Sequence, residues 1–116
     1  KEDLIDMFNA ADILVMPKVD HPFNAAAMPI KVGEYLATAN PLVSSNICDI
    51  DKYFEDGKNI LLVEPNNSKS LSEKILWVFN NKKVSKIIGE EGFKKGVEMF
   101  DYSCWTNSLL KLIGNK

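Results

Sequence analysis

Three short, largely apolar runs separated by longer segments constrain the fold of this chain more than any other feature. They cover residues 13–16, 41–45 and 60–63. Their apolar residues are continuous rather than alternating, which is typical of strands buried on both faces of a parallel sheet. Parallel neighbours must be joined by crossover connections, usually helices. The sequence therefore predicts an α/β fold, a Rossmann-like doubly wound parallel sheet with right-handed crossovers.

Apolar residues recur at helical spacing between and after these runs. The expected helices cover residues 2–9, 29–39, 50–54 and 68–80. A further helix is expected at residues 84–88, and the apolar positions up to Phe100 either extend it or form a helix that follows it. A last helix is expected to open at Asp101 or Ser103 and to run to residue 113. Asp49 is expected to cap the third of these helices, and either Ser68 or a Ser70/Glu73 capping box the fourth. The last helices are expected to form a helical C-terminal tail after the sheet.

The composition is that of an ordinary globular domain. The chain has 116 residues, of which 46% are hydrophobic and 26% charged, enough for one core. The net charge is −2 and the lysines are scattered, so nucleic acid is not an expected partner. Two cysteines and one histidine without a C-x-x-C spacing argue against zinc and favour a reducing, cytoplasmic compartment. No apolar run approaches the roughly 20 residues of a transmembrane helix.

The number of strands bears on domain organisation. Three strands are few for a doubly wound sheet, and the chain begins with Lys1 rather than Met. We therefore expect residues 1–116 to form a single, partial domain of a larger protein, truncated at its N-terminal side. Such a fragment is expected to be inactive alone.

The unit spanning residues 13–39 has the geometry of an anion site. Ligands of open α/β sheets lie beyond the carboxyl ends of the strands, where the amides of a helix N-terminus can hold a phosphate. The helix expected to begin at Pro29 carries Lys31 in its first turn and Glu34 three residues later. Lys31 can reach a phosphate, and the Glu34 carboxylate can accept hydrogen bonds from sugar hydroxyls. The alternative is that both are ordinary solvated helix residues.

Ordered sequence blocks carry a family resemblance. They are residues 9–17 (NAADILVMP), 29–37 (PIKVGEYLA), 41–45 (PLVSS) and 56–65 (DGKNILLVEP), followed by Phe100 and Trp105. In this order and spacing, over nearly the whole chain, the sequence resembles the retaining GT-B-fold glycosyltransferases of family four, the "group 1" transferases. The resemblance is to the latter part of their donor-binding, C-terminal domain.

The resemblance implies a set of donor-binding residues. Two glutamates eight positions apart flank the donor in that family; Glu34 matches the second, which contacts the nucleotide ribose. Ala26 stands at the first position, nearest the transferred sugar, and this departure puts standard activity in question. Some relatives carry a Pro-x-Lys-x-x-Glu-Tyr version of the block, which is matched by Pro29, Lys31, Glu34 and Tyr35.

The resemblance also points to backbone groups near the donor. The family's phosphate-binding amides fall on Ile30 and Lys31. Glycines of the family are replaced by Ala39 after the glutamate block and by Cys48 and Asp49 after the second strand. Side chains at the last two positions can narrow the crevice or change which sugar fits.

Four further features have both a functional interpretation and a purely structural one. His21 is either a general base or substrate contact, or a solvated loop residue. Cys48 lies in the crevice region, where a small packing residue is expected more than a reactive thiol. The D-x-D sequence of Asp49 and Asp51 matches a metal motif of other glycosyltransferases but is expected by chance at this composition, so no metal is predicted. The apolar face around Trp105 is expected to pack in the core or between domains, or, where the fragment leaves it exposed, to promote self-association.

The sequence thus favours one function and leaves two others open. The first is the transfer of a sugar from a nucleotide diphosphate sugar to a saccharide or lipid-linked acceptor, without a metal cofactor and together with a missing N-terminal domain. The location is then the cytoplasm or the inner face of the membrane, and bacterial surface polysaccharide synthesis is the analogous process. The second is a degenerate, non-catalytic nucleotide-sugar-binding or interaction module. The third and weakest is a nucleotide-sugar epimerase-like protein.

Overall fold

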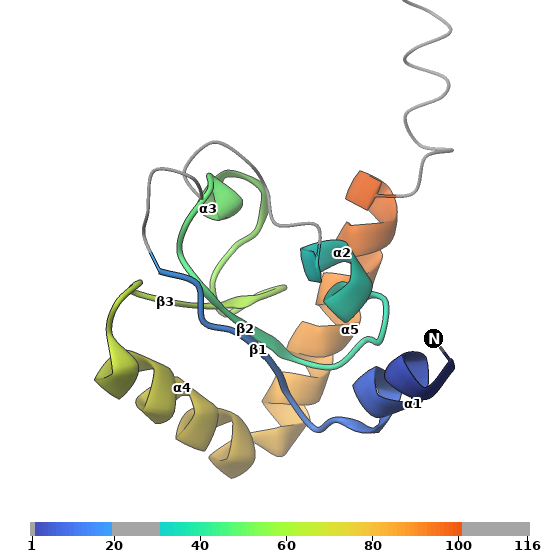
Figure 1. The fold of residues 1–116 in the computed structure, drawn as a ribbon, viewed down its shortest axis with the longest axis horizontal. Coiled ribbons are helices and arrows are strands. Elements are labelled where there is room, and N and C mark those ends of the chain that lie inside the picture. Colours follow the sequence, from blue (N-terminus) through green and yellow to red (C-terminus); the bar gives the residue numbers. More distant parts are fainter. Residues whose placement is uncertain (1, 20–30, 101–116) are drawn as a thin grey trace, which may run out of the picture.

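The predicted parallel sheet is confirmed by the computed structural model, which describes residues 2–19 and 31–100. The elements are α1 (Glu2–Ala10), β1 (Leu14–Met16), α2 (Lys31–Leu36), β2 (Leu42–Ser45), α3 (Ile50–Tyr53), β3 (Leu61–Val63), α4 (Ser68–Asn80) and α5 (Lys82–Phe100) (Figure 1). The strands pair in parallel in the order β1-β2-β3. The expected helix over residues 101–113 and the expected helix start at Pro29 lie outside the described residues.

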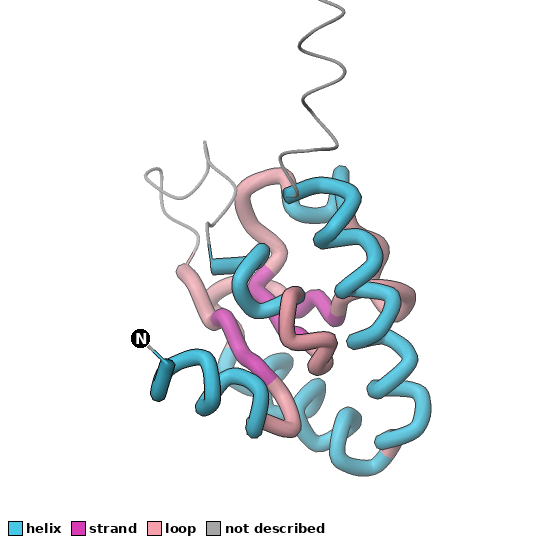
Figure 2. Tube along the Cα trace, turned by 90° about the vertical axis from the view of Figure 1, so that its right-hand side faces the viewer, coloured by secondary structure: helices cyan, strands magenta, loops and turns pink. Residues whose placement is uncertain are grey.

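Strand alternation divides the core into two clusters, one on each face of the sheet. Leu14 pairs with Leu42, and both pack with Val32 and Leu36 of α2. Val43 and its partner Leu61 point to the other face. There they pack with Val63, with Val78 of α4 and with Ile88 of α5. Helices therefore cover both faces of the strands, as a doubly wound sheet requires (Figures 1 and 2).

The two expected helix caps form differently from the predictions. Asp49 precedes α3, but its side chain makes no cap hydrogen bond, and its carboxylate lies 3.4 Å from the Lys52 ammonium. At α4 the cap is Asn67, whose side-chain oxygen accepts from the Ser70 amide at 2.9 Å. The predicted Ser68 cap and Ser70/Glu73 box are wrong, because the helix begins at Ser68 and the residue before it is itself a strong cap former.

Three glycines let α5 cross from one face of the sheet to the other. Ile88 packs in the cluster under α4, whereas Met99 packs against the cluster under α2. Between them lie Gly89, Gly92 and Gly96, spaced three and four residues apart and therefore on one helix face. All three are buried, and their close neighbours include the backbone around residues 39–41, the Asn59 carbonyl and the Leu36 side chain. None of the described helices is long and apolar enough to span a bilayer.

Alanine at Gly92 should destabilise the protein more than alanine at Gly96. A Cβ at Gly92 would lie 2.7 Å from the Asn59 carbonyl oxygen and 2.9 Å from Leu36 Cδ2, whereas one at Gly96 would lie 3.1 Å from Leu36 Cβ. Overpacking of this kind costs about 1–3 kcal/mol, while the gain in helix propensity, about 1 kcal/mol, is common to both variants. Urea unfolding measures the difference, and equal stabilities would contradict the close packing of Gly92.

Candidate functional site

The carboxyl ends of all three strands meet at one edge of the sheet, and two cavities open there. One, of about 480 Å³, lies between α3 and the end of β3. The other, of about 260 Å³, lies between the ends of the strands and the start of α4. Val63 and Glu64 line both cavities. A further cavity of about 380 Å³ is lined by residues 11–12 and 38–41, which precede β1 and β2, and therefore lies at the opposite edge.

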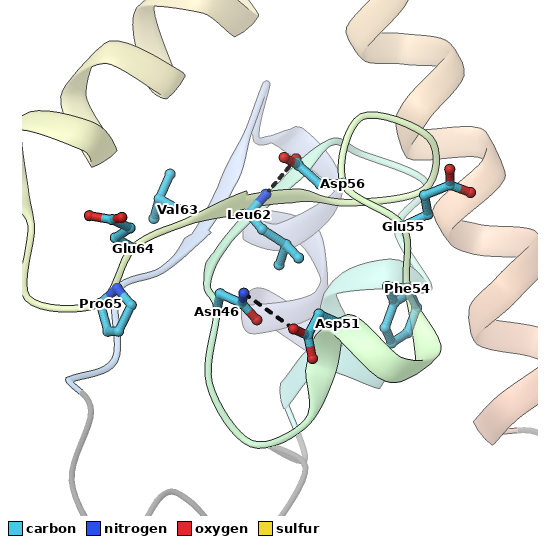
Figure 3. Close-up of a pocket in the computed structure, with 9 residues that line it drawn as sticks. All are labelled: Asn46, Asp51, Phe54, Glu55, Asp56, Leu62, Val63, Glu64 and Pro65. Atoms are coloured by element: carbon cyan, nitrogen blue, oxygen red, sulfur yellow. Dashed lines mark hydrogen bonds between the residues drawn. The ribbon is translucent and has the colours of Figure 1, made fainter.

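The larger cavity is acidic and was not expected from the sequence (Figure 3). Its carboxylates are those of Asp51, Glu55, Asp56 and Glu64. Asp51 accepts a long hydrogen bond of 3.5 Å from the Asn46 side-chain amide, and Asp56 accepts from the backbone amide of Leu62 at 2.9 Å. Asp56 therefore stabilises the edge strand β3. The described residues contain no group of three or more His, Cys, Asp or Glu side chains placed to hold a metal ion.

Two of the predicted donor-binding residues lie on the same exposed side of α2. Lys31 is the first residue of this helix and Glu34 lies three residues later, so the two side chains are neighbours on its surface. Both are exposed, and neither makes a hydrogen bond or ion pair within the part of the chain that the structure describes. Both side chains are therefore available to a ligand.

Tyr35 points in another direction. It is half-buried, and its ring packs edge-to-face on Phe8 of α1, with the ring centroids 5.1 Å apart. This contact anchors α2 beside α1 and so fixes the helix that carries Lys31 and Glu34. The remaining candidates, His21, Ala26, Pro29 and Ile30, lie outside the described residues.

Three residues stand where the resemblance implies glycines, and each has a backbone conformation that glycine favours. Ala39, Cys48 and Asp49 have φ angles of 61°, 59° and 60°, in the left-handed region that side chains disfavour. Ala39 lies in the turn after α2, where its amide donates to the Leu36 carbonyl at 3.1 Å. Cys48 is only 8% exposed, which fits the small packing residue better than the reactive thiol. The loop after β2 therefore has left-handed backbone at both positions although neither residue is glycine.

Glycine at position 49 should stabilise the protein. Asp49 is exposed and its ion pair with Lys52 is solvated, so the pair contributes little. The substitution Asp49→Gly removes backbone strain of about 1–2 kcal/mol, which exceeds the roughly 0.4–1 kcal/mol of chain entropy that glycine adds to the unfolded state. Asp49→Ala keeps the strain and should not stabilise. Asn46→Gly, in the same loop at a residue without a positive φ, should lower the free energy of unfolding because it adds chain entropy and also removes the long hydrogen bond from Asn46 to Asp51. Thermal and urea unfolding of the three variants give the ranking, and a destabilised Asp49→Gly variant would contradict it.

Comparison with known proteins identifies sequence relatives. The model of the family described as "Glycosyl transferases group 1" matches residues 1–95. An uncharacterized glycosyltransferase of Methanocaldococcus jannaschii is 30% identical over 91 residues, which cover 78% of this chain and 24% of that protein. The chain therefore spans about a quarter of the length of this relative.

Solved structures share the fold at low sequence identity. Anabaena HepE, crystallised with UDP, matches with a TM-score of 0.86 at 15% identity, over 100% of this chain and 31% of its own. Sucrose-phosphate synthase of Thermosynechococcus elongatus matches with a TM-score of 0.80 at 18% identity, over 98% of this chain and 27% of its own. The C-terminal domain of the group 1 family protein LpcC of Francisella tularensis matches with a TM-score of 0.68 at 19% identity, over 81% of this chain and 46% of its own. The expected fold class, that of a GT-B C-terminal domain, is thus confirmed.

Proposed function

The chain belongs to the glycosyl transferases group 1 family, and on that premise we propose that it forms the C-terminal, donor-binding part of a sugar-transferring enzyme. The donor is a nucleotide diphosphate sugar and the acceptor a saccharide or a lipid-linked saccharide. The observation that carries the proposal is the pair Lys31 and Glu34, whose side chains are exposed together on α2 and have no partner among the described residues. The co-crystallisation of HepE with UDP and with UDP-glucose supports the choice of donor.

In this proposal each residue of the pair has a distinct role. The Lys31 ammonium binds the diphosphate and stabilises the negative charge that develops on it as the glycosidic bond breaks, which lowers the barrier to departure. The Glu34 carboxylate accepts hydrogen bonds from the ribose hydroxyls, and such charge-assisted bonds are stronger than neutral ones. Acceptor recognition belongs to a further domain of the whole protein. We place the reaction in the cytoplasm or at the inner face of the membrane, in polysaccharide synthesis.

One sequence observation favours a second candidate function. Ala26 stands where the family's first glutamate is expected, so a carboxylate next to the reacting sugar is missing. A binding module without transferase activity would tolerate this change. Transfer and hydrolysis assays of the complete gene product with a panel of nucleotide sugars separate the two functions: nucleotide binding without turnover of any donor favours the module.

Removing the Glu34 carboxylate should weaken nucleotide binding. Loss of a hydrogen bond to a charged group costs about 1.5–3 kcal/mol, or roughly 10- to 150-fold in affinity. Calorimetry with UDP on the full-length protein should show this loss for Glu34→Ala. Glu73→Ala is the matched control, because Glu73 is also an exposed helical glutamate but lies on α4. Unchanged UDP affinity in Glu34→Ala would rule out the proposed role.

The proposed transfer uses protein charge alone at the diphosphate and should therefore persist without a metal ion. The expected result is the same initial rate of sugar transfer by the full-length protein before and after dialysis against EDTA. Lys31→Ala should lower that rate under both conditions, because the leaving diphosphate loses its cation. A rate that EDTA abolishes and Mg²⁺ or Mn²⁺ restores would contradict metal-independent transfer.

A further inference from the structure

The smaller cavity at the carboxyl edge, which we call the α4 cavity, has a mixed polar lining. It holds about 260 Å³, slightly below the roughly 300–1,000 Å³ typical of ligand pockets. Its polar side chains come from the ends of all three strands and the start of α4: Lys18, Ser45, Glu64, Asn66, Asn67 and Ser68. This size suits a ligand with a single ring rather than a whole nucleotide sugar.

Ser45 gives the α4 cavity an unused hydroxyl. The residue is 3% exposed, and its hydroxyl makes no hydrogen bond to any residue that the structure describes. Every fully shielded side-chain polar atom of the described residues has a partner, so this hydroxyl is not fully shielded. Ser45 lines the α4 cavity, which gives its hydroxyl an open space to face. The neighbouring Ser44 differs: it is wholly buried and donates to the Ser45 carbonyl at 2.9 Å.

The charges of the lining favour a neutral, hydroxyl-rich ligand. Lys18 and Glu64 contribute one positive and one negative charge, so a phosphate would meet a carboxylate as well as an ammonium. Sugar hydroxyls both donate and accept and can pair with either charged group, with the Asn66 amide and with Ser45. The Asn67 side chain is already engaged, since it accepts from the Ser70 amide at 2.9 Å and donates to the Glu64 carboxylate at 3.4 Å. Val63 and Leu71, which also line the cavity, offer an apolar wall to the C–H face of a ring.

The α4 cavity lies on the opposite side of the sheet from Lys31 and Glu34. Ser45 pairs with Val63, and Val63 belongs to the cluster under α4. The helix that carries Lys31 and Glu34 packs through Val32 and Leu36 on the other cluster. We propose that the α4 cavity is a saccharide subsite that holds one hydroxyl-rich ring separately from the nucleotide. The choice of a sugar over other polyols rests on the proposed function.

Two neighbouring serines provide the test. Saturation-transfer NMR on the full-length protein, with the methyl glycosides of glucose, galactose, mannose and N-acetylglucosamine as probes, should detect binding of at least one. Ser45→Ala should weaken that binding roughly 3- to 10-fold, as expected for one hydrogen bond, and Ser45→Val should weaken it further, because two methyl groups replace the hydroxyl at the cavity wall. Ser44→Ala is the matched control: it should leave glycoside affinity unchanged but lower the free energy of unfolding, because it removes a buried hydrogen bond.

The same variants also distinguish the saccharide subsite from the nucleotide-binding site at Lys31 and Glu34. UDP affinity measured by calorimetry should be unchanged in Ser45→Ala, and glycoside binding should be unchanged in Glu34→Ala. An equal loss of UDP affinity in Ser45→Ala would overturn the subsite by placing the cavity within the nucleotide site. Absence of glycoside binding, or binding of inorganic phosphate alone, would overturn it too. Glycoside binding in a protein that binds no UDP would instead contradict the proposed function.

Discussion

Parallel pairing of three strands is the constraint on which the rest of the structure depends. It places the carboxyl ends of β1, β2 and β3 at a single edge, so both cavities near the candidate site share the end of β3. It also requires cover on both faces, since each strand alternates between two cores. The central strand β2 is buried at all four positions. One of these, Ser45, lines a cavity at the edge, so the same pairing that builds the core also places a polar group in a candidate site.

The three strands were predictable from the sequence because residues 13–16, 41–45 and 60–63 are short apolar runs, which are typical of buried strands. The path of α5 was not. Its exposed face carries Ile87, Phe93 and Val97, so apolar periodicity gives a misleading picture of which side is buried. The informative signal is the glycine spacing at 89, 92 and 96, which indicates a face where another segment comes into close contact. Only the tertiary structure shows that the contacting segments are Leu36, the turn at residues 39–41 and the Asn59 carbonyl.

The candidate site was predictable to the extent that it lies within one helix. Lys31 and Glu34 are three residues apart, so a helical segment alone makes them neighbours. The acidic cavity combines α3, the turn before β3 and the end of β3, and no local pattern relates these segments. Asp56 illustrates the difficulty: with Gly57 it is a turn signal in the sequence, and it does precede a turn, but its carboxylate also binds the amide of Leu62 six residues away. Its second role depends on the strand being in place.

Side chains at three left-handed positions show what the fold tolerates. Ala39, Cys48 and Asp49 together impose strain of about 1–2 kcal/mol per residue, yet the turns at these positions remain. Each turn is held by buried neighbours: Leu36 and Leu42, both 1% exposed, enclose the first, and Ile47 and Ile50, at 6% and 0%, enclose the second. Burying such side chains outweighs the local strain, since each contributes about 1.5–3 kcal/mol. The backbone of each turn is thus set by apolar anchors on either side of it, and the identity of the turn residue can change without loss of the turn.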